Sequence, residues 1–357
     1  MFTSMSRNWD AEPVRGGQRS ASAVAGALLL CALLAGAAAA QEPAGDVVRL
    51  RGPSGRGEQQ VRGTVVDYTG QQIIIRRESG QEERYDGRRV IDIVSSFAEA
   101  HTQAERLMAE GRYGDSLPLL REALRAETRP WVRRRILARS VLAYQQAGQV
   151  EVAGEAFSLL LQSDPATPEF AVIPLAWLNE APPASVESAA GKWLASPQPA
   201  VRLLGASWLL TSPRRGEAAR QLEQLAHHDD PAIALLATSQ LWRTQLVTVK
   251  AEDLARWEQL VERMPASVRS GPYWLLGQAA ARLGQHESAA LYLLRIPLLY
   301  PEQQALAAEA LLAAARQLDE LQRSGEAQRL YRELATEYPF SPLAAEAQRR
   351  LNPTRTP

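Results

Sequence analysis

The feature that most constrains this chain is a change of hydrophobic period near residue 96. Residues 46–95 hold short runs of β-branched residues separated by glycine-containing pairs, and such runs are typical of strands joined by tight hairpins. Beyond residue 96, apolar residues recur at the helical period of about 3.6 and no convincing strand follows. The sequence therefore predicts a small β module followed by a mainly α body.

The helical body contains an internal repeat that is clearest when its copies are aligned on a glycine. Three copies are anchored on Gly111, Gly148 and Gly284, with apolar residues before and after the glycine at offsets that agree from copy to copy. A fourth copy, at residues 311–339, has Gln322 at the position of the glycine. Repeats of this kind predict stacked helix pairs, because one pair alone cannot bury its apolar face.

This pattern resembles the tetratricopeptide repeat. The shared features include a Leu-Gly pair that ends at Gly277 and the closing prolines Pro165, Pro301 and Pro339, whereas the first copy has Thr128 at the closing position. In such repeats a small residue lets paired helices approach, and proline stops the second helix. The resemblance implies a scaffold of helix pairs that binds peptides or partner proteins.

The middle of the body, residues 166–264, fits that pattern less well but still favours paired helices. Two related phrases place Pro199 and Pro231 at the start of apolar segments, about one repeat apart. This arrangement resembles HEAT-type repeats, in which a proline opens a helix. The expected fold is therefore an α-solenoid of tetratricopeptide-like and HEAT-like pairs, preceded by a β-barrel-like module.

The expected division of the chain follows from these patterns. It consists of a signal peptide or uncleaved anchor at 1–40, a small β module at 41–95, tetratricopeptide-like helices at 96–165, HEAT-like helices at 166–264, tetratricopeptide-like helices with a capping helix at 265–351, and a tail at 352–357. Because the period changes so sharply, we expect a chain that begins near Phe97 to remain soluble and helical.

The β module resembles small barrels of the Sm-like and SH3-like kinds, on its strand rhythm and on the phrase at residues 63–67. It also carries a group of arginines: Arg76, Arg77, Arg84, Arg88 and Arg89. One hypothesis is an anion-binding patch, which would make the chain a binding module for an anionic polymer. The alternative is a solvated strand face, because Glu78, Glu82 and Glu83 are interleaved with the arginines.

The N-terminal segment predicts export. Residues 21–40 form an uninterrupted run of apolar and small residues that follows Arg7, Arg15 and Arg19 and ends on alanines, which is the pattern of a secretory signal cleaved after Ala40. The run is also long enough for an uncleaved membrane anchor. The single cysteine lies inside it, so the exported chain would carry no thiol. We expect a periplasmic or envelope-associated protein, with membrane association through this segment as the alternative.

The charges and motifs argue against catalysis and against nucleic-acid binding. Lys+Arg and Asp+Glu are both 40, which gives a formal net charge of +0, whereas proteins that coat nucleic acid are usually basic. The sequence contains no phosphate loop, nucleophile elbow or zinc-protease motif. The cluster at residues 227–230 favours a helix end over a metal site, because adjacent helical residues do not share a face. We therefore expect no catalytic residue, cofactor or metal; an enzyme whose site is assembled across repeats remains the rival hypothesis.

Five tryptophans are the candidate partner-binding residues. They lie in the middle segment: Trp177, Trp193, Trp208, Trp242 and Trp257. Tryptophan is enriched at protein interfaces, although packing between repeats would explain it equally. The sequence thus predicts a non-enzymatic scaffold or adaptor that holds a protein or peptide partner on the concave face of the array.

Overall fold

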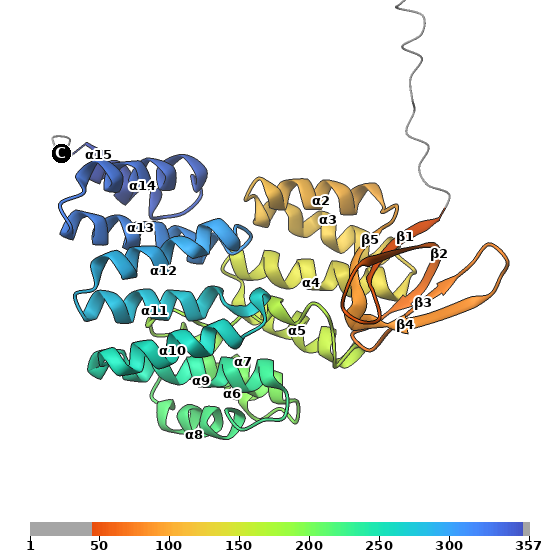
Figure 1. The fold of residues 1–357 in the computed structure, drawn as a ribbon, viewed down its shortest axis with the longest axis horizontal. Helices are drawn as coiled ribbons and strands as arrows, with labels where there is room; N and C mark the ends of the chain where they lie inside the picture. Colours follow the sequence, from red (N-terminus) through yellow and green to blue (C-terminus); the bar gives the residue numbers. More distant parts are fainter. Residues whose placement is uncertain (1–44, 353–357) are drawn as a thin grey trace, which may run out of the picture. The chain divides into compact units, whose positions relative to one another are not determined.

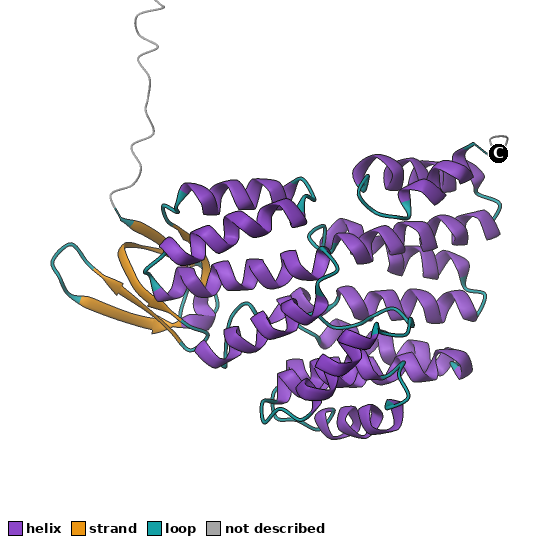
Figure 2. Cartoon of the chain, turned by 180° about the vertical axis from the view of Figure 1, so that it is seen from behind, coloured by secondary structure: helices purple, strands orange, loops and turns teal. Residues whose placement is uncertain are grey.

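The computed structural model describes residues 45–352, and all structural statements refer to this range. It contains five strands followed by helices α2 to α15, so the prediction of a mainly α chain with a small N-terminal β module is confirmed (Figure 2). No helix between residues 45 and 352 is both long enough and apolar enough to cross a membrane. The predicted export signal at 1–40 and the tail after residue 352 lie outside the described residues.

The five strands form one antiparallel sheet in the order β4-β3-β2-β1-β5. Their bounds are β1 (Asp46–Arg51), β2 (Glu58–Tyr68), β3 (Gln72–Arg76), β4 (Glu82–Asp86) and β5 (Val90–Val94), with a short 3-10 helix η1 (Gly87–Arg89) before the last strand. β1 pairs with both β2 and β5, so the last strand returns beside the first. The sequence did not predict β4, because its side chains are mostly charged.

The helices fall into three runs. The first run contains α2 (Glu99–Ala109), α3 (Tyr113–Ala126), α4 (Pro130–Gln146) and α5 (Val150–Ser163). The second contains α6 (Ala184–Leu194), α7 (Pro199–Leu209), α8 (Arg215–Leu225), α9 (Pro231–Gln245) and α10 (Ala251–Arg263). The third contains α11 (Ser270–Arg282), α12 (His286–Leu299), α13 (Gln304–Glu320), α14 (Ser324–Glu337) and α15 (Ala344–Leu351).

The turns between paired helices lie where the repeat alignment placed them. Gly111, Gly148 and Gly284 have φ of 75°, 74° and 71°, a left-handed conformation that glycine adopts without strain. Gln322 occupies the equivalent turn with φ of 58° and is the one non-glycine residue of positive φ in the described range. The register of all four turns is therefore confirmed. Pro199 and Pro231 likewise stand in the first turns of α7 and α9.

Residues 164–183 differ from the expected helix pairs. Apart from the short 3-10 helix η2 (Phe170–Val172), this connection between α5 and α6 contains no helix. The prediction of paired helices from residue 166 onward was wrong here. Several prolines interrupt the segment, and proline removes a backbone donor and disfavours helix in the residue before it.

Most helices pack on the next helix in sequence, and the first run also meets the third (Figure 1). The Tyr113 hydroxyl donates to the carbonyl oxygen of Glu302 at 3.0 Å. The backbone N–H of Ala305, near the start of α13, donates to Gln146 Oε1 at the end of α4, at 2.9 Å. Helices α2–α4 and the α12–α13 connection therefore lie side by side, although they are far apart in sequence.

The β module and the first helices share one hydrophobic core. Buried strand residues such as Leu50 and Ile75 belong to the same cluster as Leu120, Trp131 and Ile136 of α3 and α4. The indole N–H of Trp131 donates to the carbonyl of Val65 at 3.2 Å, and an ion pair joins Arg134 to Asp67. The expectation that the module is separable near Phe97 is therefore at odds with the structure, since the change of period marks no break in the core.

The contact between α11 and α12 yields a first prediction. A Cβ atom on Gly277 would lie 2.5 Å from Leu293 Cγ, closer than any real contact. Replacing Gly277 with Leu is expected to lower the free energy of unfolding by about 1–3 kcal/mol through overpacking. Thermal melts of Gly277→Leu and of the exposed control Gln348→Leu measure the difference. Equal melting temperatures would show that α11 and α12 do not meet at Gly277.

Candidate binding groove

Three of the five candidate tryptophans lie in the core. Trp193, Trp242 and Trp257 are 6%, 3% and 1% exposed. The rings of Trp242 and Trp257 stack in parallel with their centroids 4.8 Å apart, which joins α9 to α10. Packing between helices therefore accounts for these three residues, and none of them presents a surface to a partner.

Trp177 and Trp208 are only partly buried and line the same cavity of about 310 Å³. Its walls come from the turn between α4 and α5, from residues 175–183, from α7 and from the start of α13. Most of the side chains that face it are apolar. Of the predicted partner-binding residues, these two remain candidates for direct contact with a ligand.

Trp177 belongs to an extended segment, residues 173–180, which we call the strap. Side chains of α7, of the turn that follows α7 and of α9 hold it by donating hydrogen bonds to every second backbone carbonyl. Trp208 Nε1 donates to Pro174 O (2.8 Å), Gln240 Nε2 to Ala176 O (3.1 Å), Arg243 Nη2 to Leu178 O (2.7 Å) and Thr211 Oγ1 to Glu180 O (2.7 Å). The strap therefore covers the face of α7 and α9 that a partner would otherwise contact.

Arg243 is the most buried cation of this network, with 5% exposure. It donates further hydrogen bonds to Ser207 O and Gln240 Oε1, both at 2.8 Å, and to Asn179 Oδ1 at 3.2 Å. No carboxylate in the described range pairs with it, and burial lowers the pKa of its guanidinium to about 10. The charge persists at neutral pH and is stabilised by neutral acceptors alone. No sequence motif distinguishes this arginine from the others.

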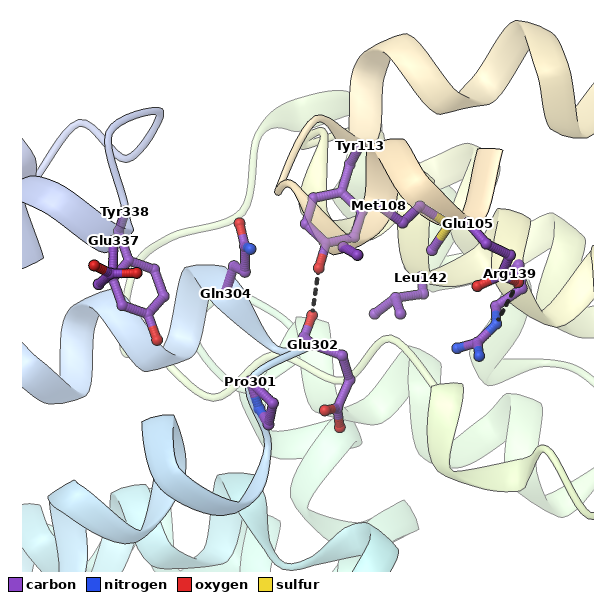
Figure 3. Close-up of a pocket in the computed structure, with 11 residues that line it drawn as sticks. Glu105, Met108, Tyr113, Arg139, Leu142, Pro301, Glu302, Gln304, Glu337 and Tyr338 are labelled. Carbon is purple, nitrogen blue, oxygen red and sulfur yellow. Dashed lines mark hydrogen bonds and ion pairs between the residues drawn. The ribbon is translucent and has the colours of Figure 1, made fainter. Parts of the chain in front are cut away.

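A second cavity, of about 440 Å³, lies where the first and third helical runs meet (Figure 3). Arg139 Nε donates to Glu105 Oε1 at 2.9 Å on one side, and Glu337 and Tyr338 lie on the opposite side. Burial raises the pKa of Glu105, but the hydrogen bond from His101 and the charge of Arg139 outweigh it and leave that pKa below its usual range. Glu105 therefore stays ionised and neutralises Arg139.

A third cavity, of about 190 Å³, connects the other two. It shares Tyr113, Gln304 and Tyr338 with the second cavity, and it shares Gln146, Leu178 and Ala305 with the tryptophan cavity. The three cavities form one depression between α2–α4 on one side and α13–α14 on the other, with the strap beneath one end. We call this depression the central groove.

Carboxylates dominate the charge of the central groove. Four of its acidic residues form no ion pair with any residue in the range 45–352: Glu180, Glu302, Glu309 and Glu337. The pKa of Glu309 is raised, first by burial and then by the neighbouring charges of Glu180 and Glu346. Because the cation of Arg139 is already paired, the groove carries a local negative charge in a chain whose formal net charge is +0.

Two further features of the groove favour occupancy by a ligand. Gln145 Oε1, at the wall of the tryptophan cavity, is buried and has no hydrogen-bond partner among the described residues. Phe340 is 70% exposed beside the third cavity. A buried acceptor without a donor is costly, and a bound chain that covered the Phe340 ring would remove apolar surface from water.

No protein-family model matches the chain. No curated protein matches it either.

The arginines of the β module do not form a free cationic patch. Arg76 pairs with Glu82 at 2.8 Å and Arg77 with Glu83 at 2.7 Å. Arg88 lies 3.4 Å from Asp86, and the guanidinium of Arg89 donates to a backbone carbonyl and lies over the Tyr85 ring. Arg84 is exposed and forms no ion pair with any residue in the range 45–352. The interleaved carboxylates neutralise most of the face, so it offers little attraction to a polyanion.

The histidine-aspartate cluster at residues 227–230 lies in the turn between the end of α8 and the start of α9. Asp230 caps α9 by accepting from the backbone N–H groups of Ala232 and Ile233, and His228 Nδ1 accepts from the Asp230 N–H at 3.0 Å. The interpretation as a helix end and turn is therefore confirmed. Within residues 45–352 no group of three or more His, Cys, Asp or Glu side chains could hold a metal ion.

Proposed function

We propose that this protein is a non-enzymatic scaffold that holds an extended segment of a protein partner in the central groove. In this proposal the helices form an α-solenoid of tetratricopeptide-like and HEAT-like pairs, with a β-barrel-like module at its start. The observation that carries the proposal is the groove itself, which joins three cavities and presents Trp177, Trp208 and Phe340 beside unpaired acceptors. Concave aromatic surfaces with a few polar groups are typical binding sites.

The proposed binding site is not simply the concave face that a helical array is expected to offer to a partner. The strap already satisfies the side chains of α7 and α9 that face it. A partner segment therefore lies over the strap and between the first and third helical runs, where Leu178 and Ala305 line two of the cavities. Recognition then depends on residues far apart in sequence.

We place this activity in the cell envelope. The support is the apolar segment at 21–40, with arginines before it and alanines at its end, which has the features of an export signal. N-terminal sequencing of the mature protein is expected to begin at or near Gln41. Recovery of Met1 or Met5 on an integral membrane species would instead favour the anchor.

Site-specific crosslinking tests the groove as the binding site. A photo-reactive phenylalanine analogue at Phe340, beside the groove, is expected to crosslink a discrete partner in living cells. The same analogue at Leu159, which is 55% exposed on α5 and lines none of the three cavities, is expected to give no such adduct.

A variant that fills the groove provides a second test of where the partner binds. Ala305 is exposed and lines two of the cavities, so Ala305→Trp fills the groove without disturbing the core. It is expected to abolish the adduct from position 340 while leaving the melting temperature unchanged. An adduct that survives this change, or that forms equally from position 159, would place the partner elsewhere.

A further inference from the structure

We infer that the central groove selects a cationic segment, in which arginine or lysine residues flank a bulky apolar side chain. The inference rests on the proposed function and adds the chemistry of the partner. In this arrangement the apolar side chain enters the cavity between Trp177 and Trp208, and the flanking cations meet the carboxylates of the groove.

Apart from Glu105, the carboxylates that line the groove have no cationic partner within residues 45–352. On the remaining surface arginines commonly pair with nearby acids, as Arg112 does with Asp115 at 2.8 Å and Arg316 with Glu346 at 2.7 Å. Glu302 and Glu337 on the groove have no such cation within the described range. Facing negative charges repel at short range and attract a cation, so a positively charged ligand complements the groove.

Glu309 is less exposed than the other unpaired carboxylates of the groove. Burial together with Glu180 and Glu346 raises the pKa of its carboxyl group, and the opposing effect of Arg316 is smaller. A carboxylate in this position is destabilised until a cation approaches it. An arginine of the ligand would supply that cation, and the Glu309 pKa would then fall toward its usual range.

The unpaired carboxylate oxygens of the groove are hydrogen-bond acceptors. The carboxylates of Glu180, Glu302 and Glu337 are exposed and form no ion pair within residues 45–352. Arginine carries five N–H donors, lysine carries three and an extended backbone adds its own. A ligand rich in donors satisfies these oxygens, whereas an acidic segment would leave them without partners and add repulsion.

The tryptophan cavity has room for one bulky apolar side chain of the partner. The tryptophan cavity, of about 310 Å³, is walled by Val150, Leu178 and Leu306 in addition to its two indole rings. That volume lies at the lower end of the range of about 300–1,000 Å³ in which ligand sites are found, and it suits one large side chain. Because Glu180 and Gln145 lie at the same cavity, an apolar anchor with a cationic neighbour fits better than an apolar run alone.

Peptide binding to the full exported chain tests the inference by fluorescence anisotropy. The probe is a blocked, labelled peptide with arginine on both sides of a central Trp-Leu pair. One matched peptide has glutamate in place of every arginine, and another has Gly-Gly in place of Trp-Leu. The cationic Trp-Leu peptide is expected to bind at low salt, the acidic peptide about a hundredfold more weakly, and the Gly-Gly peptide about tenfold more weakly.

Substitution of two groove carboxylates tests whether these residues attract the cationic peptide. Glu302→Gln combined with Glu337→Gln is expected to weaken the cationic peptide about tenfold at low ionic strength, and the loss should shrink as salt is raised. Both residues are exposed, so the fold should be unaffected. The matched control is Glu252→Gln combined with Glu320→Gln, two exposed acids outside the groove, which should change affinity less than about twofold.

The results that overturn the inference are distinct from those that overturn the proposed function. Equal binding of the acidic and cationic peptides, no binding of either, or equal effects of the groove and control variants would refute the cationic specificity. If crosslinking from position 340 nevertheless persists and is blocked by Ala305→Trp, the groove still holds a partner of different chemistry. Loss of that crosslink refutes the proposed function as well.

Discussion

A chain that begins at Phe97 is expected to lose the folded structure of α2–α4. Seven buried strand residues, among them Leu50, Val65 and Ile75, share a core with those helices. Without the sheet, Trp131 and Ile136 would face water, and burying large apolar side chains supplies about 1.5–3 kcal/mol each. Far-UV circular dichroism should show less helix than a chain that begins at Gly45, with a lower and broader melt.

A point substitution tests the same contact without deletion. Trp131→Ala is expected to cost about 3–5 kcal/mol, since it empties a buried site between α4 and the sheet. The control is Phe340→Ala, which removes an aromatic ring that is 70% exposed and should leave the melt nearly unchanged. If the chain from Phe97 melts like the chain from Gly45, the sheet contributes nothing to the helices and the shared core is unimportant.

Replacing Arg243 with Met is expected to lower the free energy of unfolding by about 3 kcal/mol. The substitution removes the donors of Leu178 O and Ser207 O, and a buried acceptor left without a donor costs about 1–3 kcal/mol. Removing the guanidinium offsets part of that loss, because it is a buried charge without a carboxylate partner. Burial lowers its pKa to about 10. The strap should loosen, so the Ala176 amide, which donates to Ser207 Oγ at 2.9 Å, should exchange with solvent faster.

Two comparisons make the Arg243 result specific. Arg220→Met on α8 removes an exposed arginine and should change stability by less than about 0.5 kcal/mol. Arg243→Lys keeps the charge but loses the planar fork that reaches several acceptors, so it should destabilise as well. Unchanged amide exchange at Ala176 in Arg243→Met would mean that the strap is held by other contacts.

The sequence predicts the helical repeats because their signals are local. Gly111, Gly148 and Gly284 each combine a turn residue with helical periodicity on both sides, and the left-handed turns lie at those glycines. Gln322 could be placed only by alignment with the other copies, because a glutamine carries no turn signal of its own. The sequence missed β4 because residues 82–86 lack an apolar alternation.

The central groove was largely beyond prediction because its residues are distant in sequence. The tryptophan count singled out Trp177 and Trp208 together with three core residues, and nothing in the sequence separates the two kinds. The strap contains apolar residues and prolines that argue against helix, but not for a particular partner surface. Arg243 resembles every other arginine until the fold buries it, and Tyr113 meets Glu302 only through tertiary packing.

The hydrogen bonds that connect the first and third helical runs close a loop of the backbone that spans 189 residues between Tyr113 and Glu302. The entropic cost of closing such a loop grows only with the logarithm of its length. The two neutral hydrogen bonds between the runs offset part of this cost, by about 0.5–1.5 kcal/mol each. Helices of both runs also belong to one hydrophobic cluster, so the groove opens by a local movement at these hydrogen bonds and not by separation of the two runs. A ligand that contacts both walls binds only when they are together, so ligand affinity and wall closure are thermodynamically linked. Exchange at the Ala305 amide, which bridges the walls through Gln146, measures that equilibrium directly.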